Sequence, residues 1–103
     1  MNKKLKAVVR PEISFRRGEF KNDQTMTQKL PAELKRRILD YLKSAEPGIM
    51  GDMPLIDPVT GVVYERTNVL REKDGFEWST AEIYMIEHYD VALTNDFLRL
   101  FNY

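Results

Sequence analysis

The sequence contains no cysteine among its 103 residues. A chain without cysteine forms no disulfide, carries no thiol nucleophile and offers no thiolate to a metal ion. Its apolar runs are short as well, and none approaches the roughly 20 residues that a helix needs to span a bilayer. The stretch Ala7–Val9 is too short for the apolar region of a signal peptide, which takes about 7–15 residues. We therefore expect a cytoplasmic protein.

Residues typical of catalytic sites are also scarce. The chain has one histidine, His88, and no serine lies in a Gly-x-Ser-x-Gly elbow. No glycine-rich phosphate-binding loop occurs either. A lone histidine cannot build a histidine-based metal site without carboxylates, so we expect His88 to be structural or exposed rather than catalytic or metal-binding. The sequence therefore predicts a protein that is not an enzyme and has no metal or cofactor.

Charge is divided unevenly along the chain. Residues 1–43 hold twelve Lys or Arg against five Asp or Glu, a net charge of +7. Residues 44–103 hold four against eleven, a net charge of −7, so the formal net charge of zero hides a basic half and an acidic half. Such a division concerns partners and electrostatic steering rather than the fold. Either the two halves pair within the molecule, or each faces a separate partner.

Length and hydrophobicity predict a single domain over residues 1–103, because 43% of the residues are hydrophobic. Residues 1–30 are typical of a basic segment of strand and loop, with strand-like alternation over residues 5–15 that Pro11 interrupts. Apolar residues at helical spacing then predict a helix over residues 31–46.

Turn signals divide the second half of the chain. Gly51, Pro54 and Pro58 punctuate residues 48–61, which close with a turn at Thr60-Gly61. Strands are expected within residues 55–78, where Asp74 and Gly75 predict a tight hairpin because both central residues of a type I′ turn need positive φ.

Capping signals predict helices over residues 79–103. Ser79 and Glu82 have the spacing of a capping box, with Trp78 before it and Ile83 after it in hydrophobic-staple positions. Thr94 is the candidate N-cap of a last short helix. The expected fold class is α+β, with a small, mostly antiparallel sheet packed by two or three helices.

Basic residues beside aromatic rings indicate an alternative function in nucleic-acid binding. The segment Phe15–Lys21 combines cations with two phenylalanines, a mixture that can hold phosphates and stack bases. A second basic cluster lies on the predicted first helix. The candidate nucleic-acid-binding residues are Arg16, Arg17, Lys21, Lys35, Arg36 and Arg37.

Two groups of residues carry a resemblance to a known family. The first is Asp74-Gly75-Phe76-Glu77-Trp78-Ser79 with Glu82, Tyr84, Tyr89-Asp90-Val91, Leu93 and Asp96-Phe97, and the second is Ile38–Leu42 with Glu46-Pro47-Gly48. Over residues 38–98 the chain resembles small bacterial immunity proteins, which are encoded beside polymorphic or contact-dependent toxins. The resemblance implies a non-enzymatic protein that masks a toxin domain in the cytoplasm.

A basic toxin domain would also suit the acidic half. Many toxin domains are nucleases, which need positive charge to hold phosphate backbones, and an inhibitor with carboxylates would associate quickly with them. The candidate partner-binding residues are Glu72, Asp74, Glu77, Glu82, Tyr84, Glu87 and Asp90. Tyr84 and Tyr89 are five positions apart, so we expect their side chains to diverge and at most one to be an exposed anchor.

Overall fold

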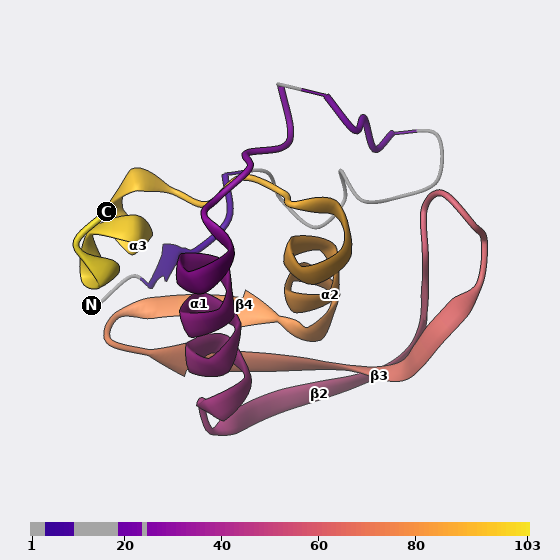
Figure 1. The fold of residues 1–103 in the computed structure, drawn as a ribbon. Helices are drawn as coiled ribbons and strands as arrows, with labels where there is room; N and C mark the ends of the chain where they lie inside the picture. The colour runs from indigo at the N-terminus through magenta and orange to yellow at the C-terminus, as the bar shows by residue number, and fades with distance from the viewer. Residues whose placement is uncertain (1–3, 10–18, 24) are drawn as a thin grey trace.

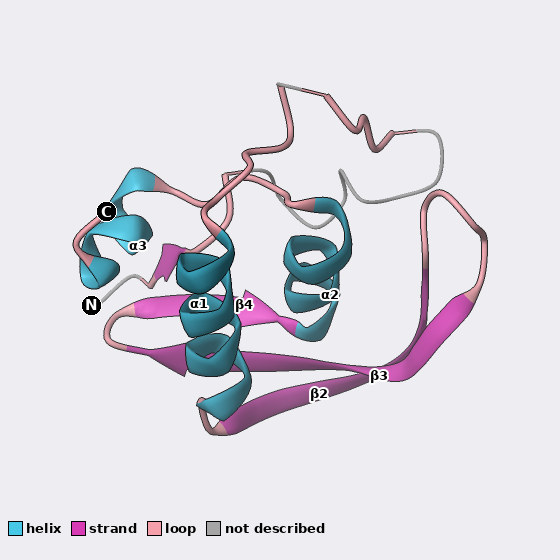
Figure 2. Cartoon of the chain, in the orientation of Figure 1, coloured by secondary structure: helices cyan, strands magenta, loops and turns pink. Residues whose placement is uncertain are grey.

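The computed structural model describes residues 4–9, 19–23 and 25–103, which form a sheet with helices packed against it (Figure 1, Figure 2). In chain order the elements are β1 (Leu5–Lys6), α1 (Ala32–Ser44), β2 (Pro47–Ile56), β3 (Val63–Lys73), β4 (Phe76–Ser79), α2 (Thr80–Tyr89), α3 (Asn95–Leu98) and the 3-10 helix η2 (Arg99–Phe101). The strand order is β1-β4-β3-β2, with β1 parallel to β4 and the other neighbours antiparallel. The predicted α+β fold is confirmed. No helix in the described ranges is long and apolar enough to cross a membrane.

Helix α1 begins one residue after its predicted start and ends two residues before its predicted end. Pro31 occupies the N-cap position, where the missing N–H of proline costs nothing. Leu34, Ile38 and Leu42 are the buried residues of the helix, and their spacing places them on one face. This face packs into the core, where the indole Nε1 of Trp78 donates a hydrogen bond to the Leu42 carbonyl oxygen at 3.0 Å.

The predicted hairpin and helix caps are confirmed. Asp74 and Gly75 have φ values of 53° and 85° and connect β3 to β4. The Ser79 hydroxyl accepts a hydrogen bond from the Glu82 backbone N–H, while the Glu82 carboxylate accepts one from the Ser79 N–H, so both bonds of the capping box are present. The Thr94 hydroxyl likewise accepts from the Phe97 N–H and caps α3.

Strand β2 corrects the sequence-based expectation, which found glycine and proline punctuation over residues 48–61 and placed the first strand of the acidic half no earlier than residue 55. The strand already begins at Pro47. It lies at the edge of the sheet, where a proline such as Pro54 is tolerated because the outer N–H positions need no partner within the sheet. Gly48 has a packing role there, since an added Cβ would lie 2.9 Å from the Leu70 carbonyl oxygen of β3.

The first strand is described only at Leu5–Lys6, so the predicted continuation past Pro11 lies outside the described residues. After β1 the chain still joins the core, because Ala7 and Val8 are buried and Val8 forms an isolated bridge with Leu93. Most of the buried apolar side chains of the described residues form one cluster, which leaves out Met26, Leu55 and Ala81. Its largest fully buried members are Trp78, Phe97, Ile38, Leu42, Met85 and Ile86.

Candidate functional site

Large apolar side chains are exposed mainly on the hairpin formed by β2 and β3. Of eleven exposed large hydrophobic residues in the described part of the chain, seven lie within this hairpin, and each is at least 44% exposed. Soluble monomers rarely gather exposed apolar side chains in this way outside an interaction site. We call these seven residues the hairpin patch: Ile49, Met50, Met53, Ile56, Val59, Val62 and Val63.

The hairpin patch is exposed because of the position of β2 in the fold. Figure 1 shows the hairpin of β2 and β3 extending past α2, beyond the part of the sheet that the helices cover. Leu55 is the only buried residue of β2. One edge of β2 pairs with β3, and no strand within the described residues pairs with the other edge. The apolar side chains therefore accompany an open strand edge.

Most of the charge close to the hairpin patch in the sequence is acidic, although Arg66 of β3 is also exposed. The sequence has no Lys or Arg between Lys43 and Arg66, but it has four carboxylates there. Three of them, Glu46, Asp52 and Glu65, are exposed. None of these three forms an ion pair within the described residues. The patch thus has acidic residues at its border whose carboxylates form no ion pair with any residue that the structure describes.

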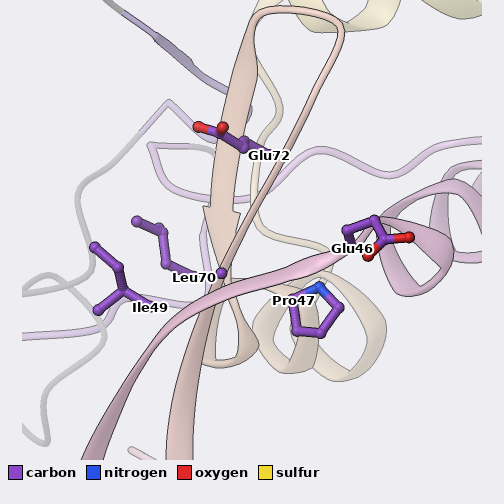
Figure 3. Close-up of a pocket in the computed structure, with 6 residues that line it drawn as sticks. Glu46, Pro47, Ile49, Leu70 and Glu72 are labelled. Carbon is purple, nitrogen blue, oxygen red and sulfur yellow. The ribbon is translucent and has the colours of Figure 1, made fainter.

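A shallow hollow lies at the start of β2, with a volume of about 330 Å³. It is lined by Glu46, Pro47, Gly48, Ile49, Leu70 and Glu72. Figure 3 shows the side chains of Ile49 and Leu70 next to each other, on the same side of the hairpin as the Glu72 carboxylate. The hollow therefore joins apolar surface from β2 and β3 to a carboxylate, a combination that suits the aliphatic stem and cationic head of Lys or Arg.

Asp57 fixes the turn of the hairpin to α2. Its side chain is buried, and its carboxylate accepts hydrogen bonds from the Tyr84 and Tyr89 hydroxyls, both at 2.7 Å. The backbone N–H groups of Val59 and Thr60 donate to Oδ1 at 2.8 and 2.9 Å. Because both tyrosines belong to α2, this carboxylate holds the end of β2 and the turn after it in place. We call Asp57, Tyr84 and Tyr89 the Asp57 cluster.

Tyr84 and Tyr89 start from different positions around α2, and neither of them is exposed. Their hydroxyls nevertheless converge, because both donate a hydrogen bond to the Asp57 carboxylate. The Tyr84 ring also stacks on Tyr64 of β3, with centroids 3.5 Å apart. His88 is exposed and packs beside Tyr84, at a ring separation of 4.3 Å.

The Asp57 cluster could be predicted from the sequence only in part. An aspartate at the start of Asp57-Pro-Val-Thr-Gly61 is typical of a turn. Local sequence patterns do not indicate its two tyrosine partners, which are distant in the sequence.

Hydrogen bonding controls the protonation of the Asp57 cluster. Burial alone would raise the pKa of Asp57, but the hydrogen bonds from Tyr84, Thr60, Tyr89 and Val59 outweigh it and hold that pKa well below its usual range. The same bonds to Asp57, reinforced by burial, raise the pKa of Tyr84 and of Tyr89 to about 12. The cluster is therefore built around an ionised aspartate and two protonated tyrosines.

These shifts predict a loss of stability in alkali. Unfolded tyrosine titrates near pH 10, and the folded pKa of Tyr84 and Tyr89 is about 12. Because the folded pKa is the higher one, the contribution is complete below about pH 10 and is lost as the pH rises toward the folded pKa. We expect urea melts to show a falling free energy of unfolding over this window, with a smaller fall for Tyr89→Phe. An equal fall in both proteins would contradict this assignment.

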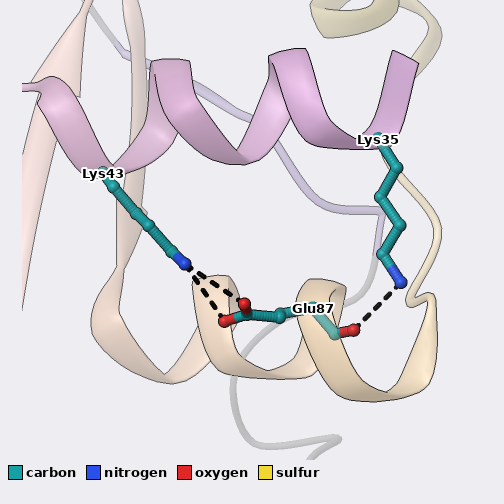
Figure 4. A network of polar contacts seen from close by, with 3 residues as sticks. All are labelled: Lys35, Lys43 and Glu87. Carbon is teal, nitrogen blue, oxygen red and sulfur yellow. Dashed lines mark hydrogen bonds and ion pairs between the residues drawn. The ribbon is translucent and has the colours of Figure 1, made fainter. Parts of the chain in front are cut away.

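The predicted partner-binding acids do not form one free surface. Lysines of the basic half pair with four of them: Lys4 with Glu72 at 3.9 Å, Lys6 with Glu77 at 2.7 Å, Lys43 with Glu87 at 3.2 Å and Lys35 with Asp90 at 2.8 Å. Figure 4 shows Lys35 and Lys43 of α1 reaching Glu87 of α2, where Lys35 bonds the backbone carbonyl. Among the described residues, the two halves of the chain therefore pair with each other.

The remaining predicted partner-binding residues also have intramolecular roles. Glu82 is buried in the capping box of α2, and Tyr84 belongs to the Asp57 cluster. Asp74 accepts a hydrogen bond from the Tyr41 hydroxyl at 2.6 Å. The structure thus brings Glu87 and Asp90 together at the end of α2 but places Glu72, Asp74 and Glu77 on the β3–β4 hairpin.

Three of the six predicted nucleic-acid-binding residues are engaged with neighbours. Arg36 pairs with Glu33 at 2.5 Å and with Asp40 at 3.6 Å, and Arg37 lies over the Phe101 ring at 5.8 Å. Lys35 bonds Asp90 and the Glu87 carbonyl, as described above. Lys21 is exposed, whereas Arg16 and Arg17 lie outside the described residues.

No protein-family model matches this chain, and no curated protein or solved structure is significantly similar to it. Within the described ranges, no group of three or more His, Cys, Asp or Glu residues is arranged to hold a metal ion.

Proposed function

We propose that this protein is a non-enzymatic binding module whose hairpin patch docks on a basic protein partner, in the manner of an immunity or antitoxin-like inhibitor of a basic toxin domain. The observation that carries the proposal is the coincidence of seven exposed apolar side chains with a stretch whose only charges are acidic. The apolar side chains and the carboxylates would contribute to binding in different ways.

The apolar side chains would supply most of the affinity. Interface energy is concentrated in a few central apolar and aromatic side chains that lose contact with water, while exposed charges at the rim contribute little to the equilibrium. Ile49, Met50 and Met53 are between 50% and 77% exposed, so each has area to bury on a partner. Methionine also adapts its shape readily to an opposing surface.

The carboxylates at the border would accelerate the encounter. Opposite potentials raise association rates, and this gain weakens as salt is added. Glu46, Asp52 and Glu65 are free of ion pairs within the described residues, unlike the predicted acids at the end of α2. We therefore place the binding surface on the hairpin, with Glu72 as the predicted acid nearest to it because Glu72 lines the adjoining hollow.

The test is co-expression with the product of the adjacent gene, which the proposal expects to be a basic toxin domain. Met50→Gln combined with Met53→Gln should weaken the complex at least about tenfold, because two apolar contacts are lost at its centre. Leu100→Gln is the matched control, since Leu100 is 43% exposed but lies outside the hairpin. Equal losses for both would contradict a hairpin interface.

A second pair of variants separates charge from apolar contact. Asp52→Asn with Glu65→Gln should slow association and flatten its dependence on salt, whereas Glu33→Gln on α1 should leave both unchanged. The nucleic-acid alternative predicts instead that the wild-type chain binds short RNA or DNA at about 50 mM salt, with a steep salt dependence. Such binding, together with no capture of the adjacent gene product, would replace the present proposal.

A further inference from the structure

The outer edge of β2 is a long, open row of backbone groups. The strand has ten residues, pairs on one side with β3 and has no strand on its other side within the described residues. Natural edge strands are usually short or protected by cationic side chains, which discourage pairing with other chains. β2 contains no cation, and its side chains are largely apolar. Pro47 and Pro54 each lack an N–H, and the pairing with β3 shifts register near both ends of the strand. The regular stretch Met50–Asp52 between them keeps its backbone groups available for hydrogen bonds.

The charge of the strand favours a foreign segment over a second copy of this chain. Asp52 lies at the middle of β2, so antiparallel pairing of two β2 strands about their centres would bring two Asp52 carboxylates to neighbouring positions. Like charges on neighbouring strands are destabilising. A strand that carries Lys or Arg would instead place a cation beside Asp52 and meet no cation from β2.

We propose that β2 receives an extended, basic segment of the partner as an added fifth strand of the sheet. This inference rests on the proposed function and specifies how the partner is held. Backbone hydrogen bonds along β2 would provide affinity, and alternate side chains of the added strand would provide specificity. The hollow beside Ile49, Leu70 and Glu72 would accept one of its Lys or Arg side chains, which would share the Glu72 carboxylate with Lys4, 3.9 Å away.

The experiment uses the full chain and a blocked synthetic peptide as long as β2, with alternating valine and lysine. Backbone amide exchange, followed by nuclear magnetic resonance, should slow in β2 when this peptide is added. A peptide of the same sequence, methylated on alternate backbone nitrogens that would face β2, should bind about tenfold more weakly because it lacks those donors. A valine–glutamate peptide is the charge control.

Charge reversal at one position gives a second readout. Wild type should bind the valine–lysine peptide more tightly than the valine–glutamate peptide. Asp52→Lys should reverse this preference, so that the valine–glutamate peptide binds more tightly. Asp52 is exposed and has no ion pair within the described residues, so this change should leave the fold intact, as checked by the unchanged amide spectrum of the core. An unchanged preference would overturn the placement of the basic strand.

The remaining outcomes distinguish this inference from the proposed function. Equal binding of the methylated peptide, or binding of the adjacent gene product through Met50 and Met53 with no protection of β2 amides, would overturn strand addition and leave the hairpin interface standing. Dimers of the free chain with protected β2 amides would assign the edge to a second copy. No binding by any peptide or by the adjacent gene product would overturn both.

Discussion

Trp78→Ala should lower the free energy of unfolding by about 3–5 kcal/mol, the usual cost of truncating a large buried aromatic residue. Trp78 is fully buried, and its ring lies 5.7 Å from Tyr41 and 6.1 Å from Phe97. Its indole N–H also holds the Leu42 carbonyl at the end of α1. The loss would therefore leave a cavity and remove a contact between β4 and α1. Denaturant melts measure this change.

The neighbouring residue supplies the control for this prediction. Ser79→Ala removes the N-cap of α2 but leaves the core filled, so it should cost about 1 kcal/mol. The two substitutions are at neighbouring positions, but Trp78→Ala destabilises the fold by leaving a cavity and Ser79→Ala by removing a helix cap. Comparable midpoints for Trp78→Ala and Ser79→Ala would contradict the central place of Trp78 in the core.

Asp57→Ala should be the most damaging change on the hairpin, at about 3 kcal/mol, because hydrogen bonds to a charged group are the stronger ones and several are lost together. The substitution leaves the Tyr84 and Tyr89 hydroxyls and the N–H groups of the turn without their acceptor. We expect faster amide exchange in residues 57–62 as well as a lower midpoint in urea. The hairpin would then be less firmly held to α2.

Two measurements make the Asp57 prediction specific. Asp52→Ala is the control, because it removes another aspartate, from β2, whose side chain is exposed. The free energy of unfolding of this variant should stay within about 0.5 kcal/mol of wild type. Acid should also lower the stability of wild type more than that of Asp57→Ala. The pKa of Asp57 is held below its unfolded value, so its contribution is present above about pH 4 and is lost as the pH falls. A wild-type acid profile unchanged by Asp57→Ala would contradict the role of this carboxylate.

Local signals explain why much of the fold could be predicted from the sequence. The Asp74-Gly75 turn, the Ser79 and Glu82 capping box and the Thr94 cap each depend on residues within a few positions of each other. Hydrogen bonds and backbone preferences between such close residues fix the local backbone conformation directly. Their positions therefore agree with the structure to within a residue or two.

Longer-range features escaped the same reasoning. Glycine and proline in β2 indicated turns, but the strand exists because pairing with β3 and a position at the sheet edge outweigh those local preferences. The Asp57 cluster joins a turn to tyrosines 27 and 32 positions away. The opposite charges of the two halves were plain in the sequence, whereas the pairing of α1 lysines with Glu87 and Asp90 depends on how the helices pack.

Amide exchange of the complex with the adjacent gene product tests the central claim most directly. The proposed function predicts slowed exchange in residues 47–65, which include β2 and the turn that carries the hairpin patch, with little change in α1. Protection confined to the basic face of α1 around Lys35, Arg36 and Arg37, with residues 47–65 exchanging as in the free protein, would contradict it.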